Sequence, residues 1–147
     1  MPLQPKPLQF SRILVILLPL LLLLPPLSIN AFAKAQINCE IQKHSCTRQM
    51  GERTVELDIT PRPVEAMKEL TFRVTISGRA PAEPPFIDLG MPAMEMGPNR
   101  VKMEKVDDGV YEGTGIIVKC PSGKTIWEAV VTVPGAGKAG FIFDVVY

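Results

Sequence analysis

Apolar and polar residues alternate in short stretches from about residue 54 onward. In segment 54–59 valine, leucine and isoleucine alternate with acidic residues, and in segment 70–77 leucine, phenylalanine, valine and isoleucine alternate with threonine and arginine. A period of two places the apolar side chains on one face, so both segments are predicted to be half-buried strands. Further strands are predicted at 86–89, 101–106, 110–120, 125–133 and 141–147.

Turn-forming residues bound these stretches. Pro61 ends the first strand because proline cannot donate to a β-ladder, and Asp108-Gly109 favours a hairpin. Gly113 and Gly115, inside a predicted strand, indicate a bulge or a close approach of two backbones. About seven short strands without a helix-length pattern predict an all-β, antiparallel β-sandwich. Its core candidates are the aromatic residues Phe72, Tyr111, Trp127 and Phe143.

The chain begins with the pattern of a secretory signal peptide. Lys6 and Arg12 precede an almost purely apolar run at 13–29, and Ala31-Phe-Ala33 supplies the small residues of a cleavage site. The alternative, an uncleaved membrane anchor, requires a longer run that is not broken by three prolines. We therefore expect a signal peptide at 1–33 and export to the periplasm or the extracellular space. A polar N-terminal arm would follow at 34–52 and the sandwich domain at 53–147.

Composition excludes several functional classes. Without residues 1–33 the chain keeps 14 basic and 15 acidic residues, a balance that argues against nucleic-acid binding. His44 is the single histidine, and the sequence contains no nucleophile elbow, zinc-binding helix motif or phosphate-binding loop. We therefore predict that the protein is not an enzyme.

Three cysteines, Cys39, Cys46 and Cys120, predict one disulfide and one free thiol in an exported protein. A bridge from the Cys39/Cys46 segment to Cys120 is favoured, because it would tie the N-terminal arm to the domain. Direct closure of Cys39 to Cys46 is the competing pairing. The remaining thiol would be buried and inert, join another molecule, or bind a soft metal.

Methionine is concentrated in segment 86–100, where Met91, Met94 and Met96 fall among two glycines and two prolines, and Met103 follows. A thioether is a soft, neutral ligand that suits Cu(I) or Ag(I). The alternative is that these side chains fill irregular gaps in the core. The glycines and prolines make the stretch a poor central strand, which favours a position at an edge or an end of the sandwich.

The order of motifs resembles the YtkA-like domain family. The resemblance covers about 64–147 and rests on Leu-Gly-Met-Pro-Ala-Met-Glu-Met-Gly-Pro-Asn at 89–99, Gly-Val-Tyr-Glu-Gly at 109–113 and the tryptophan-containing stretch 126–133. More distantly, the chain is similar to FixH-like proteins and to copper-resistance sandwiches of the bacterial periplasm. The resemblance implies an immunoglobulin-like sandwich with a role in copper handling or in the assembly of respiratory oxidases. It also implies that Met91, Met94 and Met96 are the metal ligands.

The sequence departs from the family pattern beside the methionines, where Gly-Pro-Asn at 97–99 stands in place of a histidine. This departure favours Cu(I) over Cu(II). We therefore predict a Cu(I) site formed by Met91, Met94 and Met96 with help from Met103, and a copper acceptor as partner. The alternative is a protein-interaction module whose methionine face docks a membrane-associated or periplasmic partner without metal.

Overall fold

The computed structural model describes Met1 and residues 36–147. Except for Met1, the predicted signal peptide and its cleavage site lie outside the described residues. The described residues form strands and connecting turns, and none of them belongs to a helix able to cross a membrane. The strands are β1 (Cys46–Met50), β2 (Arg53–Thr60), β3 (Glu69–Ser77), β4 (Phe86–Gly90), β5 (Arg100–Lys102), β6 (Glu104–Asp107), β7 (Val110–Ile116), β8 (Ile126–Val133) and β9 (Gly137–Asp144).

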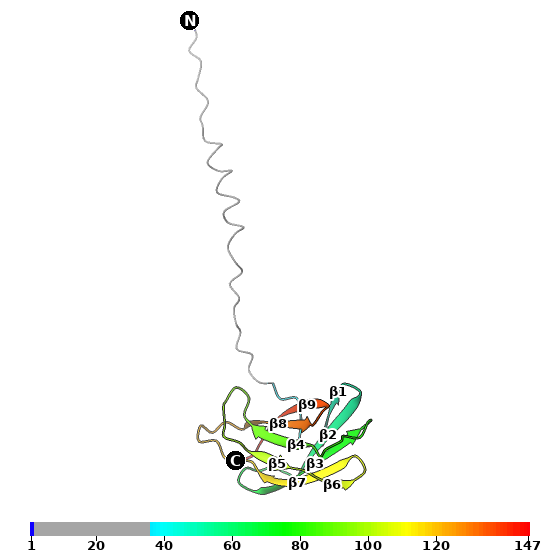
Figure 1. Ribbon diagram of the computed structural model, residues 1–147. Coiled ribbons are helices and arrows are strands. Elements are labelled where there is room, and N and C mark those ends of the chain that lie inside the picture. Colours follow the sequence, from blue (N-terminus) through cyan, green and yellow to red (C-terminus); the bar gives the residue numbers. More distant parts are fainter. Residues whose placement is uncertain (2–35) are drawn as a thin grey trace. The chain divides into compact units, whose positions relative to one another are not determined.

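The strands form two antiparallel sheets packed face to face (Figure 1). One sheet has the order β1-β2-β3-β7-β6 and the other β5-β4-β8-β9. If β1 and β5 are left out, the two sheets have the orders β2-β3-β7-β6 and β4-β8-β9. These orders match an immunoglobulin constant-type sandwich, in which one sheet contains the first, second, fifth and fourth strands and the other contains the third, sixth and seventh. The predicted all-β, immunoglobulin-like sandwich is confirmed, with nine strands in the described residues in place of about seven.

The alternating patterns position the core as predicted. All inward residues of segments 54–59 and 70–77 are buried, and so are the four aromatic core candidates. Trp127, Phe72, Phe141 and Phe143 are the largest fully buried side chains, and they come from both sheets. Burial of such side chains contributes about 1.5–3 kcal/mol each, so the pattern of the strands also supplies the main stabilisation of the fold.

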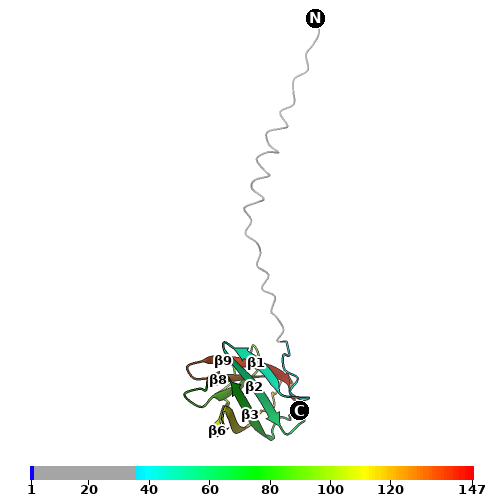
Figure 2. The same cartoon turned by 90° about the vertical axis from the view of Figure 1, so that its right-hand side faces the viewer.

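The segment assigned to a polar arm contributes a strand of the sandwich. Residues of β1 pair with β2 from Cys46↔Leu57 to Met50↔Arg53. Cys46 and Met50 are buried, but Arg48 occupies the inward position between them, so the sequence of the segment shows too little apolar alternation to be recognised as a strand. In space β1 lies beside β9, where the two sheets meet (Figure 2).

The prediction of a single strand at 101–106 is wrong. The chain divides at Met103, so that β5 pairs with β4 in one sheet and β6 pairs with β7 in the other. Gly113 permits this crossing, because a Cβ atom there would lie 2.2 Å from the carbonyl oxygen of Lys102 and 3.0 Å from the Sδ of Met103. The close backbone approach predicted at Gly113 is therefore confirmed, and it marks the point where the chain changes sheets.

One end of the sandwich, called here the loop end, is held together by hydrogen bonds between connecting segments. It comprises the β2–β3 loop (61–68), the β4–β5 loop (91–99), the β7–β8 loop (117–125) and residues 145–147, and it lies on the left in Figure 1. The contacts are Met67 N to Ile117 O (2.8 Å), Ala66 N to Val146 O (2.9 Å), Val145 N to Thr125 O (3.0 Å) and Asn99 Nδ2 to Ile116 O (3.1 Å).

The last strand, β9, ends at Asp144, before the end of the strand predicted at 141–147. Tyr147, expected to face inward, is 37% exposed. Its hydroxyl group accepts hydrogen bonds from Trp127 Nε1 and from the backbone N–H of Cys120, both at 3.1 Å, and donates to the carbonyl oxygen of Lys124. Tyr147 therefore joins the β7–β8 loop to the core tryptophan.

The favoured disulfide between the N-terminal segment and Cys120 is also wrong. Cys39 and Cys46 form the bridge, with their Cα atoms 5.6 Å apart, and Cys120 is buried and free. A turn between the two bridged cysteines, closed by a 2.9 Å hydrogen bond from Lys43 N to Glu40 O, reverses the chain and brings them together. The residues of this turn show no periodic pattern from which the turn could be predicted. The sequence therefore gave no reason to prefer the Cys39–Cys46 pairing.

Candidate metal centre

Three of the four methionines singled out in the sequence lie in the loop after β4, two of them at the ends of a tight turn. Met91 O accepts a hydrogen bond from Met94 N at 3.1 Å, with Pro92 and Ala93 between them. Pro92 supplies the fixed φ preferred at the second position of a turn, and Ala93 adopts φ 58°, as the third position of a type II turn requires. The base of the loop is closed by a 2.8 Å hydrogen bond from Leu89 N to Asn99 O.

The turn forms one wall of a surface cavity of about 620 Å³. Met91, Met94 and Met96 all line it, and its other walls come from β4, β5 and β8. The remaining lining residues are Asp88, Leu89, Gly90, Glu95, Gly97, Pro98, Asn99, Arg100, Glu128 and Val130.

The three methionines differ in how much surface they present to solvent. Met94 is 37% exposed, and Met96 is half-buried against the core. Met91 is only 5% exposed, because it continues the inward alternation of Ile87 and Leu89 on β4. Solvent therefore reaches mainly the thioether side chains of Met94 and Met96.

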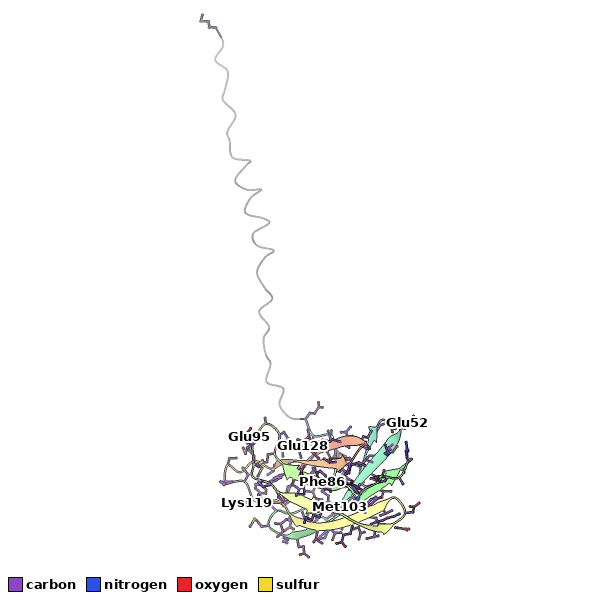
Figure 3. All side chains as sticks on the ribbon, viewed as in Figure 1. Glu52, Phe86, Glu95, Met103, Lys119 and Glu128 are labelled. Atoms are coloured by element: carbon purple, nitrogen blue, oxygen red, sulfur yellow. A yellow bond between two sulfur atoms is a disulfide. The ribbon has the colours of Figure 1, made fainter. Side chains whose placement is uncertain are left out.

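Met103 is separate from this cavity. It is 5% exposed, packs over Gly113 at the crossing between the sheets, and is not among the residues that line the cavity. Figure 3 shows Met103 away from Glu95, which marks the methionine loop. The structure thus brings together Met91, Met94 and Met96 and leaves Met103 in the core.

Harder ligands do not gather in the part of the chain that the structure describes. It contains no group of three or more histidine, cysteine, aspartate or glutamate residues able to hold a metal ion. His44 is exposed before β1, where its Nδ1 lies 2.6 Å from the carbonyl oxygen of Ser45, and it does not line the cavity. Of the donor types beside the turn, the thioethers are the ones that match a soft monovalent ion.

The charges around the cavity favour a cation. Arg100 donates to both carboxylate oxygens of Asp88 at 2.7 and 3.0 Å, and this hydrogen bonding raises the pKa of the guanidinium group. Arg100 also lies over the ring of Phe86, 3.9 Å from its centroid. Glu95 and Glu128 form no ion pair with any other residue in 36–147, so two acidic side chains of the cavity lining are unpaired, with an oxygen of Glu128 lying over Gly140 on β9.

Cys120, the other soft donor, lies in the β7–β8 loop and does not line the cavity. Its Sγ is 3.0 Å from the hydroxyl oxygen of Ser122, and hydrogen bonding from the side chain and backbone of Ser122 lowers the pKa of the thiol. Hydrogen bonds that favour the thiolate make a cysteine more reactive, but at 6% exposure this side chain has little access to solvent.

A second hollow, of about 550 Å³, adjoins the methionine cavity at the loop end. Met67, Ile116 and Val118 give it an apolar lining, and Asn99 belongs to both hollows. Met67 is 64% exposed and is held at φ 63°, with its Sδ 3.4 Å from the backbone N of Lys119. Figure 3 shows Glu95 and Lys119 at the same end of the sandwich, opposite Glu52.

Sequence reasoning missed the residues that complete the cavity. Glu128 is outward-facing because it follows the buried Trp127 on β8, and pairing with Gly90 places it beside the methionine turn. The alternation of β8 predicts its outward direction, but only the register of β4 against β8 shows which loop it approaches. Asn99 lies in the motif itself, and its link to Ile116 depends on the neighbouring sheet.

Comparison of the chain with models of protein families, with curated proteins and with solved structures finds no match.

Proposed function

We propose that this protein is an exported, non-enzymatic β-sandwich that binds Cu(I) through Met91, Met94 and Met96 and passes it to an acceptor. The observation that carries the proposal is the cavity to which one short loop, built on the Met91–Met94 turn, contributes three thioether side chains. The predicted help from Met103 is not part of the proposal, because that side chain packs over Gly113 in the core.

The chemistry of the cavity supports a soft monovalent cation. Thioethers are neutral at every pH, so protons do not compete with the metal for them, and they prefer Cu(I) or Ag(I) to hard ions. Glu95 and Glu128 add negative charge beside the sulfur atoms, which favours the approach of a cation. A site without thiolate ligands holds Cu(I) less tightly than a thiolate site, which suits transfer better than storage.

The biological setting follows from the sequence. The signal-peptide pattern at 1–33 and the Cys39–Cys46 bridge both favour an oxidising compartment such as the periplasm. The resemblance to YtkA-like domains then favours copper handling or the assembly of respiratory oxidases as the process. The acceptor would be a membrane-associated or soluble protein of the same compartment.

The test is a competition titration of residues 34–147 against a colorimetric Cu(I) chelator, without oxygen. All variants carry Cys120→Ser, because a free thiol could itself bind the metal. We expect Met94→Leu with Met96→Leu to lower the Cu(I) affinity by at least tenfold and leave the fold intact, since leucine and methionine have similar volumes. Met67→Leu removes an exposed thioether outside the cavity and should leave the affinity unchanged. Unchanged affinity in the double variant would refute the proposal.

A second candidate function is a docking module that uses the same end of the molecule without metal. It is favoured by the exposed apolar side chains of Met67, Met94 and Val118 at the loop end and of Ile116 beside it. This function predicts partner binding that is indifferent to chelators, sensitive to changes at Met94 and Met96, and lost in Met67→Asp, which places a charge on the apolar surface. Loss of partner binding in Met67→Asp with no measurable Cu(I) affinity would favour it.

A further inference from the structure

The methionine cavity offers one copy of the chain an incomplete set of accessible donors. Met94 and Met96 present side-chain surface to solvent, whereas Met91 is 5% exposed. His44 and Cys120 do not line the cavity, and the structure places Met103 elsewhere. An ion that approaches from solvent therefore meets two thioethers and two carboxylates, and the carboxylates are hard ligands poorly matched to Cu(I).

Two neutral thioethers leave much of the coordination sphere of a soft ion open. Because each thioether is a weak donor, such an ion gains more from a larger number of them than from water. A second copy of the same loop would bring two more thioethers of the same kind. A two-fold axis through the ion places Met94 and Met96 of both copies around it, since such an interface uses the same surface on each copy.

On this basis we infer that the Cu(I) site is shared between two copies of the chain, with Met94 and Met96 of each copy holding one ion. The inference rests on the proposed function and adds to it the second half of the site. Met91, the third proposed ligand, lies beneath the turn at 5% exposure and is the least accessible of the three.

The surface around the turn suits contact with a second copy. Eight large hydrophobic residues in 36–147 are exposed. Five of them belong to the loop end and a sixth, Ile116, ends β7 beside it; the five are Met67, Met94, Val118, Val146 and Tyr147. Contact through this end would remove apolar surface from water on both copies. The whole chain has a formal net charge of +1, so overall charge repulsion between two copies is small.

Local charge makes the association depend on the metal. Glu95 is exposed at the turn and Glu128 lines the same cavity, and neither forms an ion pair within the described residues. Two copies joined through their turns would bring these carboxylates toward each other, and like charges repel. A bound cation between the turns reduces this repulsion, so the metal-free chain is expected to be a monomer.

The experiment is sedimentation velocity of residues 34–147, which contain their own core and disulfide, during an anaerobic Cu(I) titration. All proteins carry Cys120→Ser, which prevents an intermolecular disulfide and binding of metal by the thiol. We expect a monomer without metal, a dimer that saturates at one Cu(I) per pair of chains, and return to monomer when a Cu(I) chelator is added. Met94→Leu with Met96→Leu should stay monomeric throughout, whereas Met67→Leu, which removes a thioether outside the cavity and keeps an apolar side chain there, should still dimerise.

The possible failures separate the two proposals. A monomer that binds one Cu(I) per chain would overturn the shared site and leave the proposed function standing. Absence of Cu(I) binding would overturn both. A dimer that forms without metal and persists in the double variant would show an interface that does not depend on the thioethers, and would also overturn the shared site.

Discussion

Ala93 holds the methionine turn in a backbone conformation that is unfavourable for a residue with a Cβ atom. Its φ of 58° lies in the left-handed region, which costs an L-residue about 1 kcal/mol relative to glycine. The conformation lets Met94 N reach Met91 O and places both methionines at the cavity. The geometry of the candidate site therefore depends on a residue that offers no ligand.

We predict that Ala93→Val opens the turn, because a β-branched side chain tolerates positive φ poorly. An added penalty of about 1 kcal/mol should speed hydrogen exchange at the Met94 amide roughly fivefold and weaken Cu(I) binding by a similar factor. Ala93→Gly is the control: relief of about 1 kcal/mol in the turn is offset by a similar entropy gain of the unfolded chain, so global stability should hardly change. Equal exchange rates in the valine and glycine variants would show that φ at this position does not control the turn.

At this scale the sequence predicts part of the site. The spacing of Met91, Met94 and Met96 around Pro92 indicated a shared loop, and the cavity contains all three. It did not indicate that Met91 is buried, because the alternation of β4 continues one residue past the strand. Nor could it separate Met103 from the others, since that depends on a crossing between sheets.

Among the strands, the crossing from β5 to β6 is the feature that one added side-chain atom would disturb most. At Gly113 an added Cβ would meet the carbonyl oxygen of Lys102 at 2.2 Å and Cγ1 of Val101 at 2.9 Å. The nearest atom belongs to the backbone, so a rotamer change cannot relieve the contact. Both the strand β5 and the sheet-switching residue Met103 must move if this space is filled.

We therefore predict that Gly113→Ala destabilises the fold by about 2–3 kcal/mol, as overpacking of a core does. Thermal unfolding followed by circular dichroism should show a melting temperature lower by about 10 °C or more. Gly90→Ala is a matched control on β4, because nothing lies within 4 Å of its added Cβ, and its stability should change little. Similar melting temperatures for both variants would mean that β5 can shift away from β7 at little cost.

Element by element, periodic strands were predictable and irregular ones were not. Segments 54–59 and 70–77 alternate regularly and became β2 and β3. Segment 101–106 is apolar and polar in the right order for one strand, yet the two halves pair with different sheets. Its division depends on the small size of Gly113 in the following strand, β7, and the pattern within 101–106 contains no record of that contact.

Across the whole molecule, closure of the sandwich depends on the N-terminal segment. The backbone N–H groups of Asn38 and Cys39 both lie near Ile142 O on β9, at 3.0 and 3.1 Å, and the Asn38 side chain accepts from Ile142 N. Beyond the turn, β1 adds to the edge of the opposite sheet. The Cys39–Cys46 bridge therefore joins a segment held by one sheet to the first strand of the other.

We predict that Cys39→Ser with Cys46→Ser lowers the free energy of unfolding by about 2.5 kcal/mol, the chain-entropy value for a closed loop of this length. For a domain of this size, that loss lowers the melting temperature by about 10 °C. Reducing agent should lower the melting temperature of the unaltered chain to a similar value. The Cys120→Ser variant should have nearly the same melting temperature as the unaltered chain. Reducing agent should still lower that temperature, because Cys120 takes no part in the bridge. If Cys120→Ser abolished that response, the bridge would involve Cys120, and the N-terminal segment would be tied to the loop end and not to its own turn.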